Sequence, residues 1–232
     1  MKAIILAGGK GTRLQSVISD IPKPMAPVAD RPFLEYLILQ LKRWAIHDIV
    51  LSVGYKKEGI MSYFSTGSRW DVNITYLEEE IPLGTGGAIR EAVKNINEPD
   101  IIVMNGDSFF NADFKELINF HYVKDSITTL ALQKRNDASR YGRVIIDEQG
   151  EIISFREKHG NEEGLINAGL YILNKGIMPY LSDGTLSFEN DVLPRIARKG
   201  IYGLVQKGFF VDIGIPDDYI NLCSNPQKLS AD

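Results

Sequence analysis

Short apolar runs alternate with amphipathic segments along the first half of the chain. Five apolar residues in a row, from Ala3 to Ala7, stop at Gly8-Gly9, which is typical of a strand buried on both faces. Residues 33–44 carry apolar side chains at helical spacing. The same patterns predict further strands over residues 48–53, 72–77 and 101–104, and further helices over residues 56–64 and 85–96. This βαβα rhythm predicts a parallel sheet wrapped by helices.

The rhythm changes after Asp107. Strand patterns follow one another with fewer helices between them, and a hairpin is expected to turn at Gln149-Gly150. These strands are predicted over residues 127–133, 143–147, 151–156 and 166–173. No linker or repeat divides the chain, so we expect one domain over residues 1–232 with two lobes, 1–110 and 111–232. The predicted class is α/β: a Rossmann-like, mixed but mainly parallel central sheet flanked by helices, with antiparallel additions in the C-terminal half.

Composition narrows the classes of function. Hydrophobic residues make up 44% of the chain, which is enough for a core. The net charge of -4 argues against a basic surface for nucleic acid, so any phosphate site must be local. A single cysteine, Cys223, excludes an internal disulfide. The apolar runs are too short to span a bilayer and no signal peptide is seen, so we expect a soluble, cytoplasmic protein without membrane contact.

The turn after the first strand has phosphate-binding chemistry. It reads Gly8-Gly9-Lys10-Gly11-Thr12-Arg13-Leu14. Glycines let backbone amides approach an anion closely, and the two basic residues add positive charge. The spacing fits neither the P-loop nor the dinucleotide fingerprint, because Gly11 follows Lys10 and Leu14 stands where the third glycine belongs. An ordinary tight turn remains the alternative for this segment taken alone.

Several other short motifs follow in a fixed order. They are Pro22-Lys23-Pro24-Met25, Gly84-Thr85-Gly86-Gly87-Ala88, Asn105-Gly106-Asp107, Tyr141-Gly142, Glu157-Lys158, Asn167-Ala168-Gly169 and Phe210-Val211-Asp212-Ile213-Gly214. Each is weak alone. Together with the glycine-rich turn, and over essentially the whole chain, they resemble the sugar-1-phosphate nucleotidyltransferases. The resemblance implies the nucleotide-diphospho-sugar transferase fold, with a nucleotide-binding first lobe and a sugar-binding second lobe.

The resemblance also implies roles for individual residues. Arg13 grips the triphosphate, Lys23 reaches the α-phosphate, and Lys158 holds the phosphate of the sugar. Asp107 and Asp212 hold one Mg²⁺, which takes few protein carboxylates and fills its other positions with phosphate and water. The sugar-phosphate site is then Gly142, Glu157, Lys158 and Asn167. The nucleotide site is Leu6, Ala7, Gly8, Gly9, Gly11, Thr12, Arg13, Lys23, Glu79, Glu80, Gly84 and Thr85.

The nucleotide base is not fixed by the residues alone. Guanine presents two adjacent N–H donors, which one carboxylate can accept together, so Glu79 or Glu80 suits it. The alternative is an acidic, solvated turn. Over the whole chain, the sequence looks most like the D-glycero-α-D-manno-heptose 1-phosphate guanylyltransferases. Ile215 and the stretch Gln15-Ser16-Val17 depart from the pattern of the wider family.

This likeness implies a Mg²⁺-dependent transfer of GMP from GTP to the heptose phosphate, with release of pyrophosphate, for bacterial surface polysaccharide. A mannose-1-phosphate guanylyltransferase and a uridylyl- or thymidylyltransferase remain alternatives. A heptose differs from mannose by one carbon and one hydroxyl, which a pocket separates by about 1–3 kcal/mol. An inactive, nucleotide-binding regulatory subunit is the alternative from another class. The base rate for soluble enzymes favours a homodimer.

Overall fold

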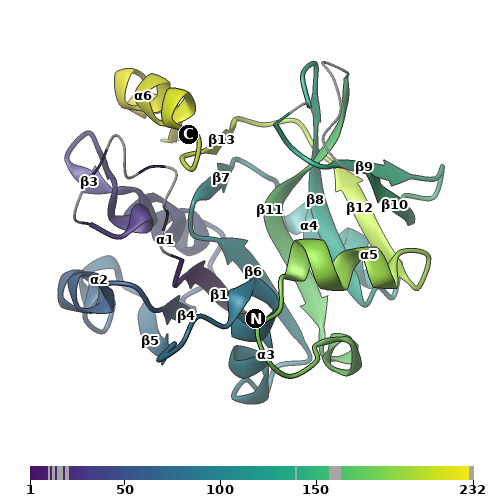
Figure 1. Ribbon diagram of the computed structural model, residues 1–232, viewed down its shortest axis with the longest axis horizontal. Coiled ribbons are helices and arrows are strands. Elements are labelled where there is room, and N and C mark those ends of the chain that lie inside the picture. The colour runs from purple at the N-terminus through teal and green to yellow at the C-terminus, as the bar shows by residue number, and fades with distance from the viewer. Residues whose placement is uncertain are drawn as a thin grey trace.

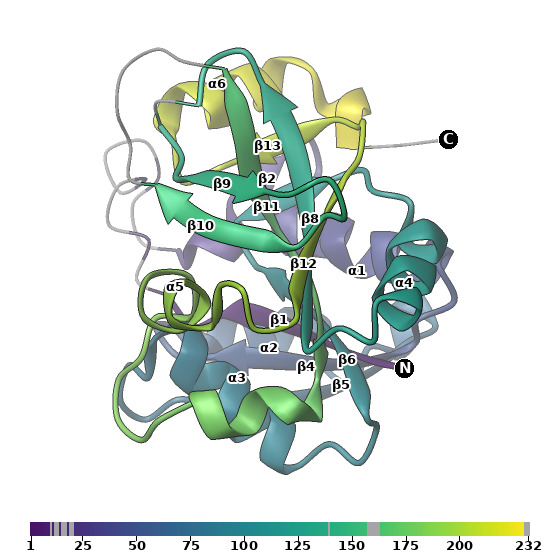
Figure 2. The same ribbon diagram turned by 90° about the vertical axis from the view of Figure 1, so that its right-hand side faces the viewer.

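The computed structural model describes residues 1–9, 11, 14, 18, 21–138, 140–156 and 163–229. Within these residues nine strands form one central sheet, which can be followed in Figure 1 and, turned by 90°, in Figure 2. They are β1 (Lys2–Ala7), β4 (Asp48–Val53), β5 (Asn73–Glu78), β6 (Asp100–Asn105), β8 (Thr128–Arg135), β9 (Arg143–Ile146), β10 (Ile152–Arg156), β11 (Gly164–Asn174) and β12 (Ile201–Val205).

The N-terminal half of the sheet is parallel. Its order is β6-β1-β4-β5, and all three neighbouring pairs run in the same direction. Three helices cover it: α1 (Phe33–Arg43), α2 (Lys57–Phe64) and α3 (Gly84–Lys94). Alternate residues of β1 face opposite sides, so Ala3 and Ile5 join one apolar core with α1 while Ile4 joins a second core with α3. The sheet is therefore buried on both faces, and ligands can approach only at its ends.

The C-terminal half adds antiparallel strands. β11 pairs with β6 from Leu170 to Asn174 and joins the two halves into one sheet, while β8 runs along its other side. The pairing of β11 with β8 shifts register between Asn167 and Tyr171, where Gly169 has a φ of +71°. β9 and β10 form the predicted hairpin, and β12 pairs with β8 in parallel. Helix α4 (Phe114–Val123) packs on β8, β11 and β12.

Shorter elements complete the fold. The strands β7 (Ser108–Phe110) and β13 (Phe210–Asp212) pair as a separate antiparallel ribbon. In Figure 1 the C-terminal helix α6 (Pro216–Ser224) lies against the N-terminal half, where Tyr219 donates a hydrogen bond to the Pro27 carbonyl. The remaining elements are β2 (Pro27–Val28), β3 (Arg31–Pro32), α5 (Leu193–Ile196), the π-helix Phe188–Val192, and 3₁₀ helices at Lys23–Met25, Ser68–Trp70, Lys175–Tyr180 and Pro226–Leu229.

The mixed α/β class with antiparallel additions is confirmed. The bounds of the predicted elements differ from the observed ones by at most two residues. Helix α2, for example, begins one residue late because Lys56 takes a left-handed conformation with a φ of +52°. The elements that were not predicted include the helices α4 and α5 and the strands β7, β12 and β13. Among the described residues, no helix combines the length and hydropathy that a membrane span requires.

Candidate active site

A cleft of about 900 Å³ opens at the carboxyl ends of the parallel strands. Its walls come from the turn after β1, the ends of β4, β5 and β6, and the start of α3. Every predicted nucleotide-binding residue that the structure describes lines this cleft: Leu6, Ala7, Gly8, Gly9, Gly11, Lys23, Glu79, Glu80, Gly84 and Thr85. Thr12 and Arg13 lie outside the described residues. The cleft also includes Pro24, Tyr55 and Asn105, to which the sequence assigned no role.

Lys23 is a buried cation in the wall of the cleft. It begins a 3₁₀ helix, with Pro22 before it and Pro24 after it, and its side chain is only 8% exposed. Its Nζ lies 2.5 Å from Asp107 Oδ2 and 3.9 Å from Asp212 Oδ1. A hydrogen bond to a carboxylate in this partly buried setting is strong, so the Lys23 side chain is held in one orientation.

The β7–β13 ribbon brings the two carboxylates together. Asp212 pairs with Ser108 in the ladder, and the Ile213 amide donates to the Asp107 carbonyl at 2.9 Å. The Gly214 amide donates to Asp212 Oδ1 at 2.7 Å, and the Ser108 hydroxyl donates to Asp107 Oδ1 at 3.2 Å. Two acidic side chains that are 105 positions apart in the sequence therefore face the same positive nitrogen.

This pair fits a divalent metal. Both carboxylates already converge on one cation, Lys23 Nζ. Across the part of the chain that the structure describes, no group of three or more His, Cys, Asp or Glu side chains could hold an ion. A metal at Asp107 and Asp212 would then complete its coordination with oxygens from water or a substrate. That is the arrangement Mg²⁺ adopts with one or two carboxylates and nucleotide phosphates.

Gly214→Ala tests how closely Lys23 is held. An added methyl group at position 214 would overlap Lys23 Nζ and crowd Asp212 Oδ1 at 2.8 Å. Because a displacement of about 1 Å at a reacting group lowers turnover about 100-fold, we expect a loss of that size in kcat with the fold retained. Gly59→Ala is the matched control, since nothing lies within 4 Å of a methyl group there and alanine favours the helix. Wild-type turnover by Gly214→Ala, measured beside the thermal midpoint of both variants, would refute this account.

Glu79 is a fixed carboxylate in the wall of the cleft. The Ser52 hydroxyl donates to Oε1 at 2.7 Å and the Leu83 amide donates to Oε2 at 3.1 Å. A side chain at position 8 would overlap this carboxylate, so glycine is required there. A carboxylate accepts about four hydrogen bonds, which leaves Glu79 with capacity for two more donors. Glu80 also lines the cleft but is exposed.

The two predicted sugar-site residues that the structure describes, Gly142 and Asn167, are not among the residues that line this cleft. Gly142 is exposed in the turn before β9. Asn167 lies on β11, where its Oδ1 accepts from the Gly169 amide at 3.0 Å and its Nδ2 donates to the Tyr171 hydroxyl at 2.8 Å. Neither lines the cleft. Glu157 and Lys158 lie outside the described residues.

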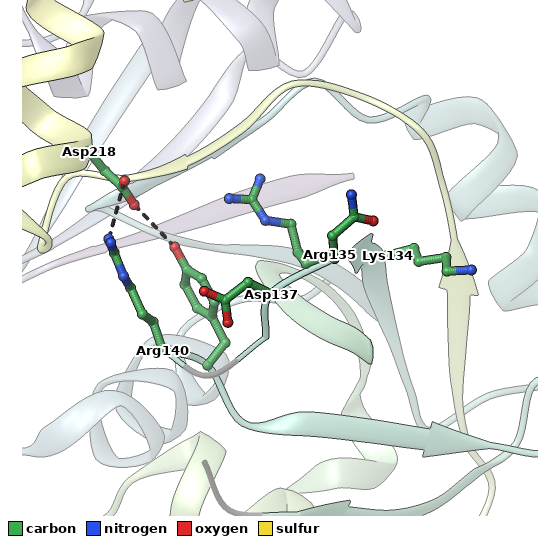
Figure 3. Close-up of a pocket in the computed structure, with 7 residues that line it drawn as sticks. Lys134, Arg135, Asp137, Arg140 and Asp218 are labelled. Atoms are coloured by element: carbon green, nitrogen blue, oxygen red, sulfur yellow. Dashed lines mark hydrogen bonds and ion pairs between the residues drawn. The ribbon is translucent and has the colours of Figure 1, made fainter. Parts of the chain in front are cut away.

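A second cavity of about 420 Å³ lies in the C-terminal half, between the end of β8 and α6 (Figure 3). Asp218 of α6 accepts hydrogen bonds from Arg140 and from the Tyr141 hydroxyl, at 3.5 and 3.4 Å. Burial, followed by the negative charges of Asp212 and Asp218, holds the pKa of Tyr141 well above its ordinary value. Tyr141 therefore remains a neutral hydrogen-bond donor beside the carboxylates.

Known proteins resemble the whole chain. A family described as Nucleotidyl transferase matches residues 2–228. The D-glycero-alpha-D-manno-heptose 1-phosphate guanylyltransferase of Aneurinibacillus thermoaerophilus is 43% identical, over 94% of this chain and 95% of that protein. The mannose-1-phosphate guanylyltransferase of Mycobacterium tuberculosis is 34% identical, over 94% of this chain and 62% of that protein.

A solved structure agrees with these sequences. HddC from Yersinia pseudotuberculosis is 38% identical, with a TM-score of 0.88, over 96% of this chain and 98% of that one. The same protein, solved in complex with GMP-PN, gives a TM-score of 0.86. The family match, the sequence identity over nearly the whole chain and the shared fold agree with one another. This chain therefore belongs to the nucleotidyl transferase family.

Proposed function

We propose that this chain is a Mg²⁺-dependent guanylyltransferase that joins GMP from GTP to D-glycero-α-D-manno-heptose 1-phosphate. The observation that carries the proposal is the full-length similarity to the heptose enzyme and to HddC. The mannose relative is less similar, and more than a third of its length lies beyond the matched region. The strand-end cleft, with its buried lysine and paired carboxylates, has the charges that nucleotidyl transfer needs.

The reaction is an in-line displacement at the α-phosphorus of GTP. A phosphate oxygen of the heptose phosphate forms the new P–O bond, and the bond to the β-phosphate oxygen breaks to release pyrophosphate. The nucleophile is an anion at neutral pH, so no general base is needed. A bound Mg²⁺ would neutralise charge on the triphosphate, held there by Asp107 and Asp212.

The basic residues divide the remaining work in this proposal. Lys23 stabilises the charge that develops on the α-phosphate, because its buried position leaves little water to screen it. Arg13 holds the triphosphate and Lys158 the phosphate of the sugar. Gly142, Glu157 and Asn167 contact sugar hydroxyls.

Turnover across a substrate panel tests the proposed function. Pyrophosphate release is measured with Mg²⁺ for ATP, GTP, UTP and dTTP, each paired with heptose 1-phosphate, mannose 1-phosphate and glucose 1-phosphate. We expect turnover with GTP and the heptose phosphate. Turnover with another pair would keep the reaction class and replace the substrates, and inactivity with every pair would contradict an enzymatic role with these substrates.

Glu79→Gln tests the recognition of guanine. We propose that the two remaining acceptor positions of Glu79 take the N1–H and N2–H of guanine. Glutamine has one acceptor oxygen, and its amide NH₂ group would face one of the two N–H donors of guanine. The value of kcat/KM for GTP should therefore fall about 10- to 100-fold. The value for UTP should change much less. Glu80→Gln makes the same change at the exposed neighbour, and a larger loss there would assign guanine to Glu80 instead.

A further inference from the structure

A segment from the C-terminal half, residues 186–192, packs against the first turn of α3. The Leu186 carbonyl accepts from the Gly86 and Gly87 amides at 2.8 and 3.3 Å, and the Leu186 amide donates to the Leu83 carbonyl at 2.9 Å. Arg90, which is 6% exposed, donates to the Ser182 and Gly184 carbonyls that precede this segment. The chain is thereby fixed against the first turn of α3, which carries Thr85.

Glu189 follows in this segment, on the π-helix Phe188–Val192, and it contacts Thr85 of the cleft wall. Its Oε2 accepts from the Thr85 hydroxyl at 2.6 Å. Thr85 in turn accepts from the Phe188 amide at 2.8 Å. The threonine hydroxyl thus has both of its hydrogen-bonding directions set by the segment that carries Glu189.

The other oxygen of Glu189 reaches toward the sugar half. Oε1 accepts from Asn105 Nδ2 at 3.3 Å and from the Tyr171 hydroxyl at 3.1 Å. Tyr171 is fully buried and accepts from Asn167 Nδ2 at 2.8 Å, while Asn167 Oδ1 accepts from the Gly169 amide. Burial, followed by the charge of Glu189, raises the pKa of Tyr171 well above its ordinary value, so its hydroxyl remains a donor.

Every hydrogen bond in this network is donated in the direction of Glu189. Thr85, Asn105 and Tyr171 each donate to Glu189, which accepts at both of its oxygens. The chain of bonds continues through Tyr171 to Asn167 and the register shift of β11. Two residues of the network, Thr85 and Asn105, line the nucleotide cleft, whereas Asn167 lies on the sugar side.

We propose that Glu189 is a positioning residue that joins the first turn of α3, at Thr85 on the nucleotide side, to the sugar-side turn at Asn167–Gly169. It touches neither substrate; it fixes the distance between the groups that do. The inference rests on the proposed function, because it takes the cleft as the nucleotide site and the β11 turn as part of the sugar site.

Two variants separate the two arms of the network. One arm is the bond from Thr85 to Glu189 Oε2, and the other runs from Glu189 Oε1 through Tyr171 to Asn167. Glu189→Gln replaces one acceptor oxygen with an amide NH₂ group, which then faces other donors, so both arms weaken. We expect KM for both substrates to rise about 10-fold or more. Tyr171→Phe keeps the Thr85–Glu189 bond and releases Asn167. It should raise KM for the sugar phosphate and leave KM for GTP within about twofold. Two controls should leave both KM values unchanged: Asn190→Ala on the same segment, and Glu148→Gln, which removes an exposed carboxylate.

A purely structural role gives a different result. It would lower the thermal midpoint and the active fraction of Glu189→Gln with both KM values unchanged, and that outcome would overturn the inference. If Glu189→Gln does not fold, Glu189→Asp keeps the charge and shortens the reach by one methylene, and it is measured in the same way. An equal rise in both KM values for Tyr171→Phe would also contradict the two-armed arrangement.

Failure of the proposed function remains distinguishable. If the wild-type protein uses another substrate pair, the variants are measured with that pair. If it turns over none, amide hydrogen exchange at Phe188 and Gly169 replaces the kinetic readout, because both amides donate into the network. Faster exchange at both in Glu189→Gln supports the coupling, and unchanged exchange at Gly169 refutes it.

Discussion

Asp107→Asn and Asp212→Asn are each expected to lower Mg²⁺-dependent turnover by about 10²- to 10⁴-fold. Asparagine keeps the size of the side chain and can still accept from the Ser108 hydroxyl or the Gly214 amide, so the β7–β13 ribbon should persist. It removes the negative charge that a metal between the two residues requires. The Mg²⁺ concentration for half-maximal rate should therefore rise together with the loss of kcat.

Asp113→Asn is the matched control for both variants. Asp113→Asn makes the same carboxylate-to-amide change at the start of α4. The Asp113 side chain is exposed there and accepts a hydrogen bond from the Glu116 amide at 3.0 Å. Asparagine serves equally well at this position of a helix. A Mg²⁺ titration of kcat for the three variants checks the assignment, and near-normal rates for Asp107→Asn or Asp212→Asn would refute it.

Lys23→Met is expected to lower kcat by about 10³-fold, with a smaller change in KM for GTP. Methionine fills much of the space of the buried lysine stem but supplies no charge to the α-phosphate during the transfer. An interaction made mainly in the transition state is lost from kcat and kcat/KM together. Steady-state kinetics with both substrates measure the split, and a rise in KM at unchanged kcat would assign Lys23 to ground-state binding.

The same variant should change how the protein responds to metal. Without Lys23, the carboxylates of Asp107 and Asp212 lose the ammonium group that both of them contact, which costs about 1–3 kcal/mol of stability and a few degrees of thermal midpoint. Mg²⁺ should restore more stability to Lys23→Met than it adds to the wild type. Lys94→Met, which removes an exposed lysine paired with Glu91, should show neither effect.

The parallel half of the fold was predictable because its strands are buried on both faces. Such strands appear as continuous apolar runs, and β1 and β6 have this pattern. Strand β12 was not predicted since Gly203 interrupts it; glycine is needed there because a methyl group would overlap the side chain of Leu132. Helix α4 carried a start signal that was not used, with Asp113 three residues before Glu116.

The motifs contain the residues that line the strand-end cleft, whereas the contacts between the parts of the site were not predictable. Strands β7 and β13 have three residues each, too few for any periodicity, and their pairing joins residues about a hundred positions apart. Glu189 contacts Thr85 and Asn105 across separations of 104 and 84 residues. No local pattern encodes such contacts, because tertiary packing alone brings these segments together.

A competition assay tests the central claim most directly. GTP, ATP, UTP and dTTP are mixed in equal amounts with heptose 1-phosphate and mannose 1-phosphate, and the nucleotide sugars formed with Mg²⁺ are identified by mass. Product ratios under competition equal ratios of kcat/KM. We expect GDP-heptose as the main product, with GDP-mannose formed about 10- to 100-fold more slowly. A main product that carries another base, or mannose in place of heptose, would contradict the assignment.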